Sequence, residues 1–133
     1  MAETAATTHI TQVGTVIVPV SDQDRALEFY VDKLGFEKRT DTTFAGGQMR
    51  WLEVAPPGAT TTLAIVPPRE GDPTGVPTGI ALSSTDIDAD HADFLARGVD
   101  ADEAVSRMGD PVPPMFFFRD PDGNTLFLSL IHI

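Results

Sequence analysis

Three side chains that alternate along one short segment could bind a small molecule. Met49, Trp51 and Glu53 are spaced two residues apart, and side chains with that spacing lie on one face of a β-strand. A tryptophan ring offers a broad apolar surface, methionine adapts to irregular shapes, and a carboxylate attracts donors and cations. Leu52 and Val54 form the natural core-facing pair, so we expect the other three side chains to face a ligand.

Glu53 is the most informative of these residues. A carboxylate among apolar neighbours is costly to bury without a partner. We therefore expect Glu53 to be exposed, to pair with an arginine such as Arg50 or Arg119, or to face the ligand. In the last case it could act as an acid–base group or anchor a cationic part of the ligand.

Other large apolar side chains are candidates for the same ligand site. They are Phe44, Met108, Met115, Phe116 and Phe118. Because three consecutive Phe residues (116–118) alternate between the two sides of a strand, some of them must face the core. The whole set predicts a broad, adaptable pocket for a planar apolar ligand.

The histidines are poor candidates for metal binding. His9 precedes the first predicted strand, and His132 is the penultimate residue. His91 falls on the apolar stripe of a predicted helix, where we expect it to be packed and hydrogen-bonded.

The elements that position these residues begin with an apolar run at residues 13–20, which predicts a buried strand. A helix should follow, because Ser21 and Asp24 match a capping box and Gly35 suits a helix end. The first half is completed by predicted strands at residues 36–44, 48–55 and 61–66.

After a Pro- and Gly-rich loop at residues 67–77, the same order of elements begins again. A predicted strand at 78–84 precedes a helix with Thr85 and Asp88 as its capping box and Gly98 at its end. Predicted strands follow at residues 99–107, 115–119 and 125–131.

This repetition predicts one domain over residues 1–133, with halves at 12–66 and 78–133. Shifting the sequence by 64 residues places residues 15–22 over residues 79–86. The fold class is α+β, with two tandem βαβββ units forming a cupped mixed sheet. We expect the two sheets to meet edge to edge around a shared concavity.

Two groups of motifs resemble a known superfamily. VIVPVSD at 16–22, ALEFY at 26–30 and LGF at 34–36 are similar to the opening of vicinal-oxygen-chelate proteins, which include glyoxalases, bleomycin-resistance proteins and extradiol dioxygenases. FRDPDGN at 118–124 resembles their closing turn. The superfamily contains both enzymes and non-catalytic drug-binding proteins, so the resemblance implies the fold and leaves the function open.

The resemblance also indicates where the metal-using members carry His or Glu ligands. The matching positions are Thr15, Gly79, Phe127 and either Thr62 or Ala64. These side chains are not the usual ligands of a divalent ion that keeps open coordination positions. We expect neither a metal nor another cofactor.

The favoured hypothesis is a metal-independent protein that sequesters a bulky aromatic or cationic natural product. The resemblance to resistance proteins suggests ligands like bleomycin, mitomycin or enediynes. It also implies a homodimer with binding grooves between protomers and residues 13–20 near the interface. The alternative is a glyoxalase-like or dioxygenase-like enzyme (a lyase, isomerase or oxygenase) that uses displaced metal ligands or Glu53.

Composition narrows the range of partners. Nine basic and twenty acidic residues give a net charge of -11, which disfavours nucleic acid and anionic membranes. No run of apolar residues is long enough to span a bilayer. The absence of cysteine excludes disulfides and thiolate chemistry, and a cytoplasmic location is the default expectation.

Overall fold

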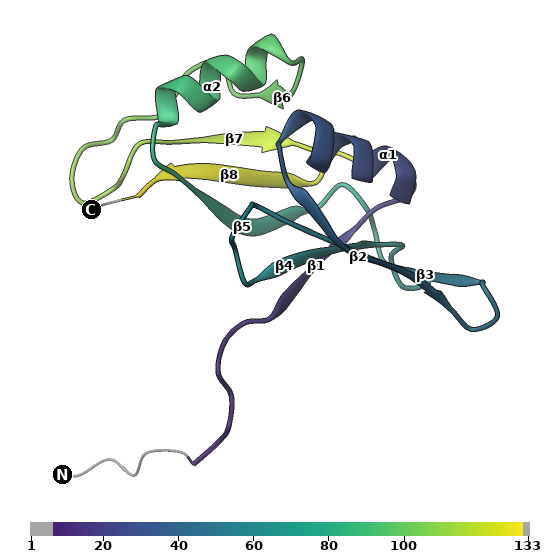
Figure 1. The fold of residues 1–133 in the computed structure, drawn as a ribbon. Helices are drawn as coiled ribbons and strands as arrows, with labels where there is room; N and C mark the ends of the chain where they lie inside the picture. Colours follow the sequence, from purple (N-terminus) through teal and green to yellow (C-terminus); the bar gives the residue numbers. More distant parts are fainter. Residues whose placement is uncertain (1–6, 132–133) are drawn as a thin grey trace.

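Two four-stranded sheets and two helical segments make up the described part of the chain, residues 7–131 (Figure 1). His132 lies outside the described residues. The first half contains β1 (Thr15–Pro19), α1 (Gln23–Glu28) continued by a π-helical turn, η1 (Phe29–Lys33), then β2 (Glu37–Phe44), β3 (Met49–Ala55) and β4 (Thr62–Val66). The second half contains β5 (Pro77–Ser84), α2 (Ile87–Ala96), β6 (Asp100–Ala101), β7 (Met115–Arg119) and β8 (Thr125–Leu130).

The strand order is the same in both halves. It is β1-β4-β3-β2 in the first sheet and β5-β8-β7-β6 in the second. The first strand of each half runs parallel to the last, and the remaining neighbours are antiparallel. The predicted α+β class with tandem βαβββ units is therefore confirmed. No strand of one sheet pairs with a strand of the other within the described residues.

Both helices are capped one residue later than the sequence predicts. The carboxylate of Asp22, not the hydroxyl of Ser21, accepts from Arg25 N at 3.1 Å. Asp86 accepts from Ala89 N at 3.1 Å in the second half, in place of Thr85. Aspartate is as good a cap as serine, and its charge also favours the helix N-terminus. No helix in the described residues has the length and apolar character needed to cross a membrane.

The predicted strand at 99–107 shrinks to β6 and one isolated bridge between Ser106 and Met115. Asp102 interrupts it, because its carboxylate accepts from Phe117 N at 3.1 Å and from Arg119 at 3.0 Å. Aspartate side chains that bond to the backbone in this way compete with the regular ladder of a sheet.

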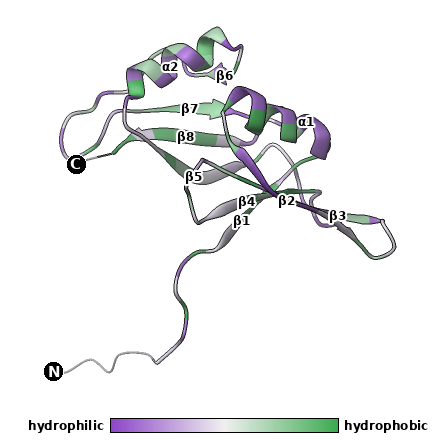
Figure 2. Ribbon diagram, in the orientation of Figure 1, coloured by the Kyte–Doolittle hydropathy of each residue, from purple (hydrophilic) through white to green (hydrophobic). Residues whose placement is uncertain are grey.

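One hydrophobic core joins the two halves. Fully buried residues of the first half include Val18 and Tyr30, and those of the second include Phe118 and Leu126. Figure 2 shows β7 and β8 as hydrophobic strands, whereas β2 is a hydrophilic edge strand. Shared burial of this kind makes the two repeats one packing unit.

The turn between β7 and β8 fastens the second half to the first. Asn124 is fully buried, and its Nδ2 donates to the carbonyl of Pro19 at 2.7 Å. The Tyr30 hydroxyl donates to Asp120 at 2.9 Å, and Asp122 accepts from the backbone and hydroxyl of Ser21. The motif noted at 118–124 therefore holds the end of β1 and the π-helical turn against sheet two.

Candidate functional site

The side of β3 that faces away from the helices carries the three residues noted first in the sequence. Leu52 and Val54 are fully buried in the core. Met49, Trp51 and Glu53 lie on the opposite face, which we call the open face of the first sheet. Met49 is 49% exposed, and Trp51 and Glu53 are partly buried. The predicted alternation of β3 therefore matches the structure.

A chain of hydrogen bonds fixes the side chains on this open face. Trp51 Nε1 donates to Glu53 Oε2 at 2.5 Å, and Thr62 Oγ1 donates to Glu53 Oε1 at 2.6 Å. Thr15 Oγ1 lies 3.2 Å from Thr62 Oγ1. The Trp51 bond uses the edge of the indole and leaves its ring face free. Each carboxylate oxygen keeps a lone pair for a further donor.

Of the three possibilities expected for Glu53, pairing with an arginine is not observed: Arg50 and Arg119 both pair with aspartates. Arg50 binds Asp41 at 2.8 Å and Asp24 at 2.7 Å on the helix side of the sheet. The hydrogen bond that Arg50 donates to Asp41 lowers the pKa of that carboxyl group. Strand alternation gives the reason. Arg50 and Glu53 are three residues apart, so their side chains point to opposite faces of β3.

Phe44 extends the open face toward the tip of the β2–β3 hairpin. It lies opposite Met49 in the strand register, and both side chains are 49% exposed. Thr42 lies opposite Trp51. Directly opposed residues share a face, so Phe44 is on the same side as Trp51. The hairpin projects from the body of the molecule in Figure 1.

The second sheet has its own open face, and it is aromatic. Phe117 is 41% exposed, and its ring centroid lies 5.3 Å from that of Phe127. Met115 shares this face because it is two residues from Phe117. The run of three Phe residues predicted that some of them face the ligand, and alternation along the strand could have separated Phe117 from its two neighbours.

Phe116 and Phe118 do not lie on that open face. Both are buried under α2, where the ring of Phe94 packs edge-on against them at 5.5 and 5.2 Å. The expectation that they line a ligand cavity is corrected, because they form the core of the second half. Met108 is 74% exposed in the loop before β7 and belongs to neither sheet.

The strand register identifies the fourth position of the implied metal site. Ile17 pairs with Ala64 in the first half as Ala81 pairs with Phe127 in the second. Ala64, not Thr62, is thus the equivalent of Phe127. The four positions hold one hydroxyl (Thr15), two groups without a donor atom (Ala64, Gly79) and one aromatic ring.

These side chains do not fit a divalent metal ion. Within residues 7–131, no group of three His, Cys, Asp or Glu side chains could hold an ion. His91 Nε2 lies 2.7 Å from the carbonyl of Asp102, and its ring packs edge-on against Phe116. His91 is therefore packed and hydrogen-bonded at the edge of the core. The open faces can bind by stacking, shape and hydrogen bonding.

An apolar groove of about 660 Å³ separates the edge of the first sheet from β5. Its walls include Val16 and Leu63 of the first sheet on one side and Gly79, Ile80 and Leu82 of β5 on the other. The two open faces belong to different sheets.

The sequence profile of the Glyoxalase/Bleomycin resistance protein/Dioxygenase superfamily matches residues 9–128. Among solved structures, TnmS3, an antibiotic binding protein from Streptomyces sp. CB03234, is 38% identical, with 94% of this chain and 99% of that chain covered and a TM-score of 0.82. A superfamily member from Sphaerobacter thermophilus DSM 20745 is 37% identical, with 93% and 100% covered and a TM-score of 0.86. YetH of Bacillus subtilis (strain 168) is 34% identical, with 90% of this chain and 98% of that protein covered.

Proposed function

Since this chain belongs to the glyoxalase/bleomycin resistance protein/dioxygenase superfamily, we propose that it is a metal-independent protein that sequesters a bulky aromatic or cationic natural product. The observation that carries the proposal is the open face of β3, where Glu53 orients the indole of Trp51. The likeness to TnmS3, described as antibiotic-binding, supports the same class of ligand.

Trp51 and Glu53 would divide the work of binding. The indole is held at its edge, so it presents a rigid face on which a planar ligand can stack at little cost in side-chain entropy. The free lone pairs of Glu53 would accept a hydrogen bond from an ammonium or hydroxyl group of the ligand. The net charge of -11 favours approach by a cationic ligand and disfavours nucleic acid and anionic lipid.

We further propose that the ligand lies between two copies of the chain. Apolar side chains on the open faces are strongly exposed, at 55% for Ile17, 49% for Phe44 and 41% for Phe117. Apolar surface of this kind usually marks an interface. In a symmetric dimer, the first sheet of one protomer would face the second sheet of its partner, so Trp51 and Phe117 would enclose the ligand from two sides. We also propose that each chain forms one domain and that the dimer is cytoplasmic.

Calorimetric titration with three probes tests the proposal: doxorubicin as a flat aromatic amine, mitomycin C, and bleomycin. We expect saturable binding of at least one probe. In a parallel fluorescence titration, that probe should quench the emission of Trp51, the single indole of the chain. Trp51→Ala should weaken binding by about 30-fold, equivalent to about 2 kcal/mol for an aromatic anchor. Trp51→Phe should retain most of the affinity.

Glu53→Gln separates the two roles of that carboxylate. It keeps the size of the side chain but removes its charge, so it should weaken a cationic probe more than a neutral one. Leu95→Ala is the matched control, because Leu95 is an exposed apolar residue of α2 and belongs to neither open face. Unchanged affinity in Trp51→Ala, or chemical conversion of the bound probe seen by mass spectrometry, would contradict the proposal.

A further inference from the structure

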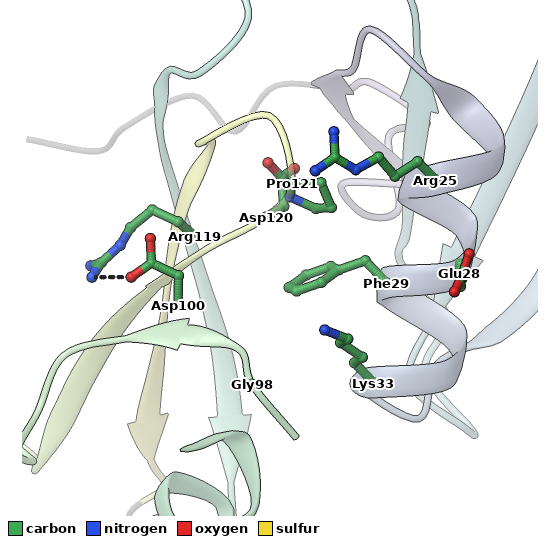
Figure 3. A pocket seen from close by; sticks show the side chains of 9 residues that line it. All are labelled: Arg25, Glu28, Phe29, Lys33, Gly98, Asp100, Arg119, Asp120 and Pro121. Atoms are coloured by element: carbon green, nitrogen blue, oxygen red, sulfur yellow. Dashed lines mark hydrogen bonds and ion pairs between the residues drawn. The ribbon is translucent and has the colours of Figure 1, made fainter. Parts of the chain in front are cut away.

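A second cavity lies between the first helical segment and the end of the second sheet (Figure 3). Its volume is about 370 Å³. Arg25, Phe29 and Lys33 line one side, and Asp100 and Pro121 lie across from them. Figure 3 shows the three helical side chains pointing toward the facing segments. This cavity lies on the helix side of the first sheet, away from its open face.

Two of the cations in this cavity are free to bind a ligand. Of nine Lys and Arg residues in the chain, six form ion pairs within the described residues. The other three are Arg25, Lys33 and Arg69. The side chains of Arg25 and Lys33 also make no hydrogen bond within the described residues. In a protein with net charge -11, two unpaired cations that line one cavity need an explanation, because acidic partners are plentiful.

The acidic groups of the cavity are largely occupied. Asp100 binds Arg119 at 3.1 Å. Asp120 is buried and accepts four hydrogen bonds, from the Tyr30 hydroxyl, the Asn124 side chain and two backbone amides. Glu28 is the remaining acid, and in Figure 3 it does not point across the cavity. The groups left to meet a ligand are therefore mainly cationic donors.

The spacing of the helical residues sets the shape of ligand that fits. Arg25, Phe29 and Lys33 follow one another at intervals of four, so they lie along one side of the helix. The two cations are eight residues apart, and the second half of this span is the π-helical turn η1. Between them lies the ring of Phe29, and Gly98 also lines the cavity.

We propose that this cavity binds a small organic dianion with a flat apolar body. Its anionic groups would contact Arg25 at one end and Lys33 at the other, and its body would lie over Phe29 and Pro121. Guanidinium and ammonium groups both bind carboxylates strongly, the first in a bidentate manner. The site is independent of the open-face ligand, since it uses neither Trp51 nor Glu53.

Terephthalate is the probe that tests the site, with its neutral analogue terephthalamide and the monoanion benzoate for comparison. Titrated into the ¹⁵N-labelled full chain, terephthalate should shift the amide resonances of Phe29, Gly98 and Asp100 in a saturable manner. Arg25→Gln and Lys33→Gln should each weaken its binding about fivefold, as expected for a partly exposed ion pair. Arg69→Gln removes the same charge elsewhere and should have no effect.

Three results would overturn the assignment. One is the absence of saturable shifts around the cavity, and another is equal weakening by Arg69→Gln, which would indicate a general charge effect. The third is equal binding of benzoate, because a dianion that bridges both cations must bind more tightly than a monoanion. Spectra of the variants without probe check their folding, since neither side chain makes a hydrogen bond within the described residues.

Discussion

Asn124→Ala should weaken the attachment of the second half of the protein to the first. The Asn124 side chain makes four hydrogen bonds: Nδ2 donates to Pro19 O at 2.7 Å and to Asp120 Oδ2 at 2.9 Å, and Oδ1 accepts from Gly75 N and Val76 N at 2.9 Å each. It is fully buried, so water cannot replace the lost partners.

The magnitude follows from these four bonds. Each is worth about 1 kcal/mol net, and buried groups left without a partner add their desolvation cost. We expect a loss of about 4 kcal/mol, which is a large part of the 5–15 kcal/mol typical of a domain. With an m-value of about 2 kcal/mol/M, the urea midpoint should fall by about 2 M.

Urea unfolding followed by Trp51 fluorescence and by circular dichroism measures this loss. Asp122→Ala is the matched control in the same turn. Within residues 7–131 its carboxylate hydrogen-bonds only to Ser21, and these bonds are exposed. Asp122→Ala should therefore cost under about 1 kcal/mol. A loss below about 1 kcal/mol for Asn124→Ala, or equal losses in the two variants, would refute the view that this buried amide fastens the halves.

Three further predictions concern other contacts. Burial, followed by the charge of Asp120, raises the pKa of the Tyr30 phenol. The contribution of the neutral phenol to the free energy of unfolding is therefore complete below the unfolded pKa of about 10, and it is lost as pH rises further. In urea unfolding at alkaline pH, Tyr30→Phe should not show this loss of stability. Arg50 lowers the pKa of Asp41, so stability from this group is present above about pH 4 and lost as pH falls. Asp41→Asn should lower the free energy of unfolding by under about 1 kcal/mol at pH 7. In urea unfolding at pH 2, a difference in stability from the parent protein that is as large as at pH 7 would contradict this. Phe116→Ala should cost about 3–5 kcal/mol and Phe117→Ala far less, because only Phe116 is in the core; calorimetric melting compares them.

Local pattern in the sequence determined the repeated order of elements and the faces of β3. Strand alternation has a period of two, so the buried Leu52 and Val54 fixed the side of Trp51 and Glu53 without knowledge of any neighbour. The same rule could have separated Phe117 from Phe116. Each of these features depends on residues close together in the chain, and the amino-acid order is sufficient to state them.

Only the tertiary structure decided which distant groups meet. Glu53 binds Trp51 and Thr62 instead of an arginine, and the register of β1 against β4 places Thr15 beside Thr62, 47 residues away. Asn124 reaches Pro19 across 105 residues. No local period reports such contacts, because they are set by how whole strands and halves pack.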